Sequence, residues 1–155
     1  MIIGVLKEIH PGERRVAMAP SVAKQCLKNG DYVFLEQGAG VIANFTDDQY
    51  EDCGAEIIES AEKIWEQADV ILKIRPPEEN LETGKHEADL LRKDACLICL
   101  LNPGRNPDLL KRLAKTGGTA IAVDAIPRIS RAQSMDVLSS MANISGYRAV
   151  TEAAH

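Results

Sequence analysis

Short apolar runs alternate with amphipathic segments along most of the chain. The alternation of these two patterns predicts a parallel β-sheet with helices on both faces, an α/β fold of the Rossmann-like (flavodoxin-like) type. Apolar runs predict strands at residues 2–6, 32–35, 56–58, 70–74, 97–101 and 119–123. Helical periodicity predicts helices at residues 22–29 and 61–67, and two more that begin near residues 46 and 106.

Capping residues indicate where several of the predicted helices begin or end. Gln49 follows Thr46 at the spacing of a capping box, and Ser60 precedes the helix at 61–67. Asn106 stands before a proline at the first helical position, and Gly117 stands where that helix should end. Between these elements, residues 78–90 are polar and predict loops.

The last helix begins near Asp136 and meets no glycine or proline near the end of the chain. An uninterrupted helix at that point predicts that the sequence continues into something longer. We therefore expect a Rossmann-like domain at residues 1–135, and the start of an interdomain helix at 136–155 that leads to a second domain outside this chain.

Composition narrows the class of protein. The chain has 155 residues, only 4% aromatics and a net charge of −5, which predicts an aliphatic core and argues against a nucleic-acid partner. No apolar run approaches the roughly 18 residues of a membrane span, so any membrane connection is expected to come through a partner. Cys96 and Cys99 form a C-x-x-C, but they lie in an apolar strand, where residues three apart point to opposite faces. We expect free thiols in a reducing cytoplasm and no metal.

A glycine-rich segment at 38–43 matches the pattern G-x-G-x-x-A of dinucleotide-binding loops. That loop should open a helix of about three turns. Here polar and aromatic residues interrupt the segment, and a new helix cap follows at Thr46. The context therefore favours a glycine-rich connection without a cofactor.

Two cations stand after predicted strands, at the sheet edge where α/β folds bind ligands. Arg15 follows the first strand and Lys73 ends an apolar one. Together they could clamp a carboxylate, or both could be solvated surface cations. His10 and His86 lie in polar, turn-like sequence and are predicted to be surface histidines rather than catalysts.

The segment 127–150 is the strongest candidate site. Arg128 and Arg131 offer planar donor forks for phosphate or carboxylate, and Gln133 can recognise an amide. Asp136 and Ser139 add two more polar groups. The simpler alternative is a solvated connection whose Ser134 or Asp136 merely caps the following helix. The small residues of that helix predict close approach of another element, as at a hinge.

These segments resemble the N-terminal region shared by alanine dehydrogenase and the α subunit of proton-translocating NAD(P) transhydrogenase. The resemblance covers nearly the whole chain, and its most specific block, at 124–143, is similar to the transhydrogenase version. It rests on Gly-Val-Leu-Lys-Glu-Ile and Glu-Arg-Arg-Val-Ala-Met-Ala-Pro near the start, Gln-Gly-Ala-Gly at 37–40, Ala-Asp-Val-Ile-Leu-Lys at 68–73 and Asn-Pro-Asp-Leu-Leu at 106–110.

The resemblance implies an NAD(H)-binding component that exchanges a hydride with NADP(H) on a partner. Arg128, Gln133, Asp136 and Ser139 would contact NAD(H), with Ser130 in the same loop. It further implies a homodimer, a transhydrogenase β subunit and a membrane component that moves protons. The chain would then be cytoplasmic and peripheral to the inner membrane. Direct hydride transfer requires no acid–base residue and no metal from this chain.

Two departures from the family pattern leave alternatives open. Residues 100–103 contain no histidine, whereas alanine dehydrogenases carry one there, although Arg15 and Lys73 match the carboxylate-binding pair of those enzymes. The family's glycine-rich NAD fingerprint would lie beyond residue 155, so the chain alone is expected to be inactive. The alternatives are an alanine dehydrogenase-like oxidoreductase and a truncated, non-catalytic domain that dimerises.

Overall fold

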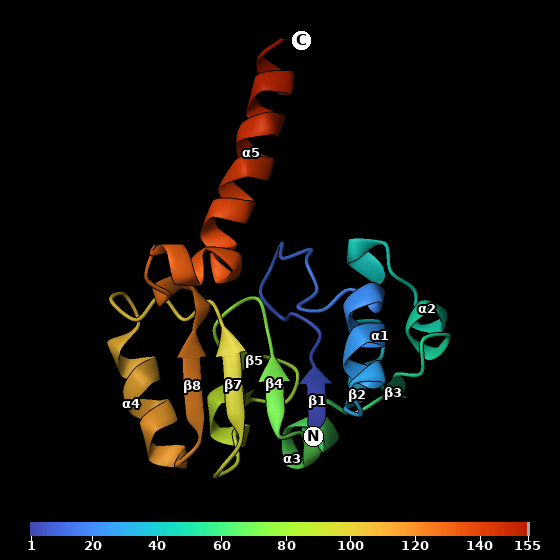
Figure 1. The fold of residues 1–155 in the computed structure, drawn as a ribbon. Coiled ribbons are helices and arrows are strands. Elements are labelled where there is room, and N and C mark those ends of the chain that lie inside the picture. Colours follow the sequence, from blue (N-terminus) through green and yellow to red (C-terminus); the bar gives the residue numbers. More distant parts are fainter. Residues whose placement is uncertain (155) are drawn as a thin grey trace.

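A six-stranded parallel sheet organises the computed structural model, which describes residues 1–154 (Figure 1). The strand order is β3-β2-β1-β4-β7-β8. The strands are β1 (Ile2–Val5), β2 (Tyr32–Glu36), β3 (Glu56–Ile58), β4 (Val70–Leu72), β7 (Cys96–Cys99) and β8 (Thr119–Ala122). This order confirms the Rossmann-like prediction, and it is the Rossmann order rather than that of flavodoxin. The direction of strand addition reverses between β1 and β4, which makes a topological switch point there.

Helices and turns connect the strands. The helices are α1 (Pro20–Lys28), α2 (Asp47–Glu51), α3 (Ala61–Gln67), α4 (Pro107–Thr116) and α5 (Val137–Ala153). Four 3-10 turns are η1 (Val41–Ala43), η2 (Glu87–Leu90), η3 (Val123–Ala125) and η4 (Ser130–Met135). A short antiparallel hairpin of β5 (Glu79–Asn80) and β6 (Lys85–His86) projects after β4.

Two apolar cores lie on opposite faces of the sheet, as the prediction of helices on both faces requires. One core packs α3, η2 and α4 against the sheet and contains the buried Trp65, Ile71 and Leu97. The other packs α1 and α2 around Val5 and Tyr50. The cores are aliphatic apart from a few aromatic rings, in line with the composition.

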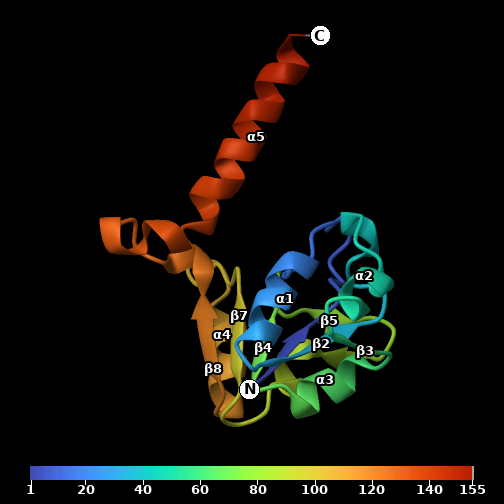
Figure 2. The ribbon, with the colours of Figure 1, turned by 45° about the vertical axis from the view of Figure 1, so that its right-hand side comes forward.

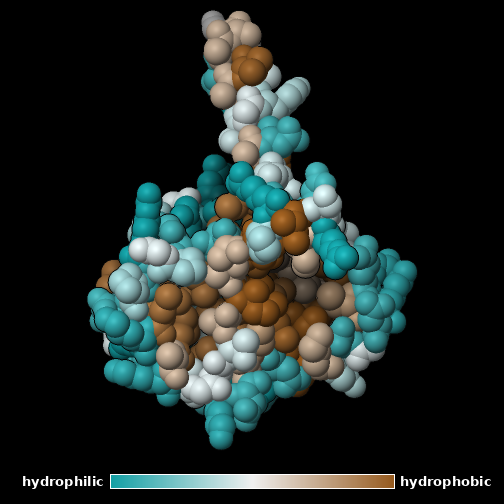
Figure 3. Space-filling model, turned by 60° about the vertical axis from the view of Figure 1, so that its left-hand side comes forward, coloured by the Kyte–Doolittle hydropathy of each residue, from teal (hydrophilic) through white to brown (hydrophobic). Residues whose placement is uncertain are grey.

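In the part of the chain that the structure describes, half of the α1 face carries no helix. α1 and α2 cover β1, β2 and β3, whereas β4, β7 and β8 present partly exposed side chains on that face, including Ile121 at 42% exposure. Figure 3, which brings the β8 edge forward, shows apolar side chains gathered in a hollow beneath the projecting last helix.

α5 leaves the body of the domain and points away from it (Figures 1 and 2). Every residue from Ala142 to Val150 is exposed, and α5 has no buried residue. Its first turn is held at the sheet edge, where Asp136 caps it. The prediction of a helix from about residue 136 is confirmed through Ala153, and His155 lies outside the described residues.

Most predicted elements agree with the structure within two residues, with instructive exceptions. Gln49 Oε1 accepts the Thr46 backbone N–H at 3.0 Å, as the capping box predicts. Asn106 makes no side-chain cap, because its Nδ2 donates instead to the Leu101 carbonyl at 2.8 Å. The segment predicted as loops at 78–90 contains the β5–β6 hairpin and η2.

Candidate functional site

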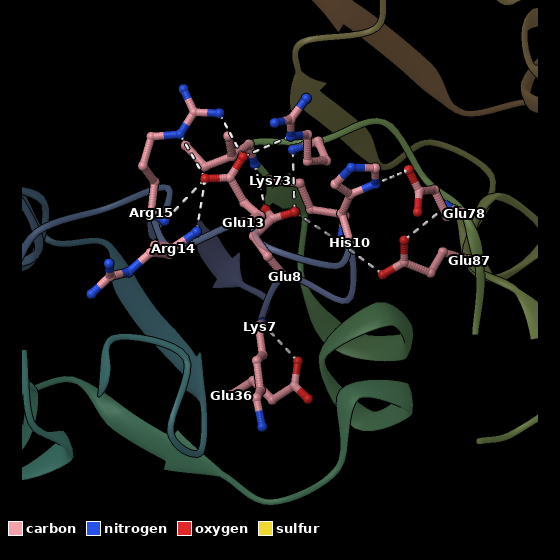
Figure 4. Close-up of polar contacts among 12 residues, drawn as sticks. Lys7, Glu8, His10, Glu13, Arg14, Arg15, Glu36, Lys73, Glu78 and Glu87 are labelled. Carbon is pink, nitrogen blue, oxygen red and sulfur yellow. Dashed lines mark hydrogen bonds and ion pairs between the residues drawn. The ribbon is translucent and has the colours of Figure 1, made fainter. Parts of the chain in front are cut away.

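Charged side chains gather where β1 and β4 end, at the switch point of the sheet (Figure 4). Glu8, Glu13 and Arg15 follow β1, and Lys73 and Arg75 follow β4. This is the edge at which open α/β sheets bind ligands. Because the strands are parallel and adjacent, residues about 60 positions apart in the sequence meet there.

Lys73 is buried within an ion cluster rather than solvated. Its side chain is 0% exposed, and Nζ lies 2.8 Å from Oε1 of Glu87 and 3.7 Å from Oε2 of Glu8. The second oxygen of Glu87 accepts the Glu78 backbone N–H at 3.0 Å. The alternative of a solvated Lys73 is therefore wrong, because two carboxylates from the chain itself compensate this ammonium.

Glu13 holds two arginines. Its Oε1 accepts from Arg15 Nε at 2.7 Å, and its Oε2 accepts from Arg15 Nη2 and Arg75 Nε, both at 2.6 Å. The Glu13 side chain is only 4% exposed. The Arg15 guanidinium beside it holds the pKa of the Glu13 carboxyl well below its usual range. Glu13 thus fixes where both guanidinium groups point.

Glu8 ties the end of β1 to the end of β4. The backbone N–H groups of Ile74 and Arg75 donate to its two oxygens at 2.5 and 3.2 Å. Burial raises the pKa of the Glu8 carboxyl, against the opposing field of Lys73. Burial likewise raises the pKa of Glu36, whose Oε2 accepts the Lys7 N–H at 2.8 Å. The switch point therefore carries several buried carboxylates that the chain itself binds.

A cavity of about 420 Å³ opens beside this cluster and reaches the base of α5. Its wall is mostly aliphatic, with Arg15, Lys73 and Asp136 as the charged groups among its residues. Apolar lining comes from Leu72, Ile98, Leu100, Val123, Val137 and Met141. Arg15 also reaches α5 directly, because its Nη1 donates to Sδ of Met141 at 2.7 Å. The structure thus brings the predicted pair Arg15 and Lys73 to one cavity.

Among the described residues predicted to contact the cofactor, Asp136 alone lines this cavity, together with its loop neighbour Ser134. It also caps α5, accepting from the Ser139 N–H at 3.0 Å and from Ser139 Oγ at 2.6 Å. The Ser139 hydroxyl bond lowers the Asp136 pKa. The capping alternative therefore describes what Asp136 does in this structure, and Ser139 is its partner.

The remaining loop residues predicted to bind a cofactor are solvent-facing. Ser130 and Gln133 are exposed within η4, as is Arg131. The Arg128 side chain is 69% exposed, and its Nε lies 3.7 Å from Asp136 Oδ2. The structure therefore gathers Arg128, Asp136 and Ser139 at the base of α5. Ser130 and Gln133 stand on the preceding turn.

The weaker sequence motifs have structural explanations. The segment 38–43 forms the short turn η1, and the Gly38 N–H donates to Asp47 at 3.0 Å, which agrees with a glycine-rich connection. His10 pairs with Glu78 at 2.7 Å, and His86 Nδ1 accepts the Ala88 N–H at 3.1 Å. Both histidines are partly exposed.

The cysteines are free, and Cys99 lies in the core, where burial raises its pKa to about 12. Within residues 1–154, no group of metal-ligating side chains has the arrangement of a metal site.

Sequence reasoning missed the carboxylates that organise this site. Glu87 lies in a segment predicted as loop, yet it is 5% exposed and pairs with Lys73. Glu13 and Arg75 were not singled out either. One signal was available in the sequence: Glu8 and Glu13 follow the first predicted strand closely, as Arg15 does. The ion pairs between residues on different strands could not be predicted from the sequence without the strand order.

Comparison with known proteins gives a consistent picture. Residues 4–145 match the family described as "Alanine dehydrogenase/PNT, N-terminal domain". NAD(P) transhydrogenase subunit alpha of Cereibacter sphaeroides is 47% identical over 99% of this chain and 28% of its own length. Alanine dehydrogenase of Bacillus subtilis is 34% identical over 94% of this chain and 36% of its own length.

A solved structure agrees with these matches. The crystal structure of transhydrogenase from Sinorhizobium meliloti superposes with a TM-score of 0.89 at 38% identity, covering 99% of this chain and 44% of that one. The chain therefore spans less than half the length of each of these relatives.

Proposed function

This chain belongs to the alanine dehydrogenase/PNT N-terminal domain family, and from that premise we propose that it forms one wall of the NAD(H) site of an NAD(P) transhydrogenase α subunit. Membership implies a nicotinamide nucleotide as ligand. The proposal is that this nucleotide is NAD(H), and that a partner component presents NADP(H) for direct hydride exchange. That exchange would be coupled to proton translocation by a membrane component.

The ranking of relatives supports a transhydrogenase over an alanine dehydrogenase. The identity is 47% to a transhydrogenase α subunit and 34% to an alanine dehydrogenase. The absence of histidine at residues 100–103 favours the same branch. Arg15 and Lys73 favour the second candidate, an alanine dehydrogenase-like oxidoreductase, because they share a cavity that could admit a small carboxylate. Against it, Glu13, Glu8 and Glu87 already compensate both cations.

The single observation that carries the proposal is the grouping at the base of α5. Arg128, Asp136 and Ser139 meet there, beside a largely aliphatic cavity. Such a combination fits a nicotinamide nucleotide, which presents an apolar ring face, an amide and phosphates. The nicotinamide, when bound, supplies the hydride chemistry.

The residues of this chain would bind and orient the nucleotide, and they would exclude water from it. Arg128 would donate to a phosphate or an amide oxygen, because its guanidinium is mostly solvent-facing. Gln133 and Ser130 would add hydrogen bonds from η4. Asp136 and Ser139, already bonded to each other, would offer a fixed carboxylate and hydroxyl. No residue of this chain needs to exchange a proton with the substrate.

The assembly is also part of the proposal. Residues 1–135 would be one domain, and 136–155 would begin an interdomain helix toward a domain that carries the glycine-rich fingerprint. The whole would be a homodimer docked on a β subunit and a membrane component, cytoplasmic and peripheral to the inner membrane. Within the described residues, no helix has the length and apolarity to cross a bilayer.

Hydride transfer distinguishes the candidates. The protein that contains this chain, assembled with its β partner, should reduce an NAD analogue with NADPH. A lack of transfer, together with NAD reduction that depends on alanine, would support the alanine dehydrogenase-like candidate. If neither reaction occurs and NADH does not bind, a non-catalytic dimerising domain remains.

Arg128→Ala tests the site itself. In the same assembled protein, NADH binding should weaken by about 1.5 to 3 kcal/mol, roughly ten- to a hundredfold, because one charged hydrogen bond is lost. Arg112→Ala is the matched control, since Arg112 of α4 pairs with Asp89 of η2, away from the loop. An unchanged dissociation constant for Arg128→Ala would remove Arg128 from the site. Micromolar binding by residues 1–155 alone would contradict an incomplete cleft.

A further inference from the structure

Arg75 presents unused hydrogen-bond donors at the switch-point edge of the sheet. Its Nε donates to Glu13 Oε2 at 2.6 Å, and its side chain is 41% exposed. Within residues 1–154, its two terminal nitrogens, Nη1 and Nη2, have no hydrogen-bond partner. Arg15 differs, because its terminal nitrogens donate to Glu13 and to Met141. Arg75 therefore keeps a pair of donors in the arrangement that a carboxylate accepts.

The Arg75 side chain is held in place by the chain itself. Its backbone N–H donates to Glu8 Oε2 at 3.2 Å, and Glu13, which accepts from Nε, has a side chain only 4% exposed. Two prolines follow directly, at 76–77, and restrict the backbone. A half-exposed arginine ordinarily loses rotamer freedom when it binds an anion. Much of that freedom is already lost here, which favours affinity for an anion.

The carboxylates and the arginines of this edge are unequally exposed. The side chains of Glu8, Glu13 and Glu87 are 3%, 4% and 7% exposed, whereas those of Arg15 and Arg75 are 40% and 41% exposed. The carboxylates compensate their cations from inside the fold. The surface that another molecule would meet is therefore cationic, although the cluster contains as many carboxylates as cations when Lys73 is counted.

The position of Arg75 separates it from the proposed nucleotide site. Arg15 lines the aliphatic cavity at the base of α5, and Arg75 does not. Arg75 nevertheless neighbours that cavity, since its Nε and Arg15 Nη2 donate to the same oxygen of Glu13. Direct hydride exchange requires the two nicotinamides to touch. The component that carries NADP(H) must therefore approach where the cavity opens, beside Arg75.

We propose that Arg75 binds a carboxylate side chain of the component that presents NADP(H), and that Glu13 and Glu8 position it for this contact. This inference rests on the proposed function and names one point of contact with the partner. A carboxylate of the partner is favoured over a nucleotide phosphate, because Arg75 lies outside the cavity that the nucleotide would enter. A charged pair at the rim of an interface speeds encounter and fixes the orientation of the partner.

Titration of the whole protein that contains this chain with its NADP(H)-presenting component tests the proposal. Hydride transfer from NADPH to an NAD analogue is measured as that component is added, at several salt concentrations. Arg75→Gln should raise the half-saturating concentration by about tenfold, with an unchanged affinity for NADH. The dependence of that concentration on salt should become weaker, because one ionic contact is lost. Arg75→Lys keeps the charge but not the fork, so it should restore the salt dependence more fully than the affinity.

Arg14→Gln is the matched control. Arg14 is exposed at the same edge, and Figure 4 shows its guanidinium pointing away from Glu13. The substitution removes the same charge as Arg75→Gln but removes no donor that Glu13 orders, so the half-saturating concentration should change little. An equal effect of the two substitutions would overturn the proposal, since a general positive potential would then explain both.

The outcomes separate this inference from the proposed function. If the wild-type protein transfers no hydride, the proposed function fails and this inference fails with it. If the wild-type protein transfers hydride and Arg75→Gln saturates at the same concentration, only this inference fails. Weaker NADH binding by Arg75→Gln would assign the anion to the nucleotide, which also overturns the inference. Thermal unfolding checks that the variants fold, and if Arg75→Gln does not, Arg75→Lys should still raise the half-saturating concentration.

Discussion

Nζ of Lys73 lies 2.8 Å from Oε1 of Glu87, and the two side chains are 0% and 7% exposed. They lie 14 positions apart in the sequence. The contact joins the end of β4 to η2 across the β5–β6 hairpin. A buried ammonium is tolerated only where carboxylates compensate it, and this pair holds together the two ends of the segment that contains the hairpin.

Lys73→Met should lower the free energy of unfolding by about 3 to 5 kcal/mol. The substitution leaves Glu87 and Glu8 buried without their cation, and desolvated charges without a partner are costly. Urea denaturation measures the loss. Adding Glu87→Gln should recover part of it, since one orphaned carboxylate is then removed. Lys111→Met is the control, because Lys111 and Asp108 form an exposed pair whose loss should have no measurable effect.

The lowered pKa of Glu13 predicts the direction in which the stability of the fold changes with pH. Its pKa is lowered in the folded state, so its stabilisation is fully present above the unfolded value of about 4.3. That contribution is lost as the pH falls below this value and through the folded pKa. At pH 7, Glu13→Gln should cost about 2 kcal/mol, because charged hydrogen bonds to Arg15 and Arg75 are weakened. The gap between variant and wild type should narrow on acidification, and a gap that widens would contradict this account.

Asp136→Ala separates capping from ligand binding. Loss of the cap should destabilise the first turn of α5 by about 1 kcal/mol, with faster amide exchange there. Asp136→Ser restores a capping oxygen and should recover most of this protection. If Asp136 also contacts NAD(H), as proposed, Asp136→Ser should still bind the nucleotide poorly in the assembled protein. If Asp136→Ser recovered amide protection and NAD(H) binding equally, Asp136 would act only as a helix cap.

Substitution by alanine should have opposite effects on stability at two of the glycines. A Cβ on Gly4 would overlap Ile64 Cγ2 and would lie 2.9 Å from Ala68 Cβ, beneath α3. Gly4→Ala should therefore destabilise the domain by about 1 to 3 kcal/mol, since a well-packed core resists added volume. Gly146 lies within α5 with no atom near its added Cβ. Gly146→Ala should stabilise that helix by about 0.5 to 1 kcal/mol. Thermal unfolding of both variants measures the contrast.

Local patterns were sufficient to predict most of the helices and strands. The apolar runs at 2–6 and 119–123, the glycine at 117 and the cap at Ser60 each report on neighbours within a few residues, and the structure agrees with them. The half-covered sheet could not be predicted in the same way. Whether a helix covers β8 depends on the direction in which strands are added, which no local pattern encodes.

The site was predictable only in part. Arg15 and Lys73 were found because strand ends point to ligands in this class of fold. Their partners were not, because Glu87 and Glu13 reach them through pairings that depend on the hairpin and on the strand order. The roles proposed for Arg128, Ser130 and Gln133 stay predictions. Those side chains are mostly exposed to solvent, so a ligand or a further domain would have to supply the contacts that the prediction requires.

The attachment of α5 makes it a lever arm. Within residues 1–154, the contacts that hold the helix lie at its base, where Asp136 caps it and Arg15 contacts Met141. Its 17 residues extend about 25 Å, so a tilt of about 10° at the base displaces the tip by about 4 Å. A change in how Glu13 orients Arg15 would therefore be amplified along the helix. Any element attached to the far end would move several times further than the side chains that steer it.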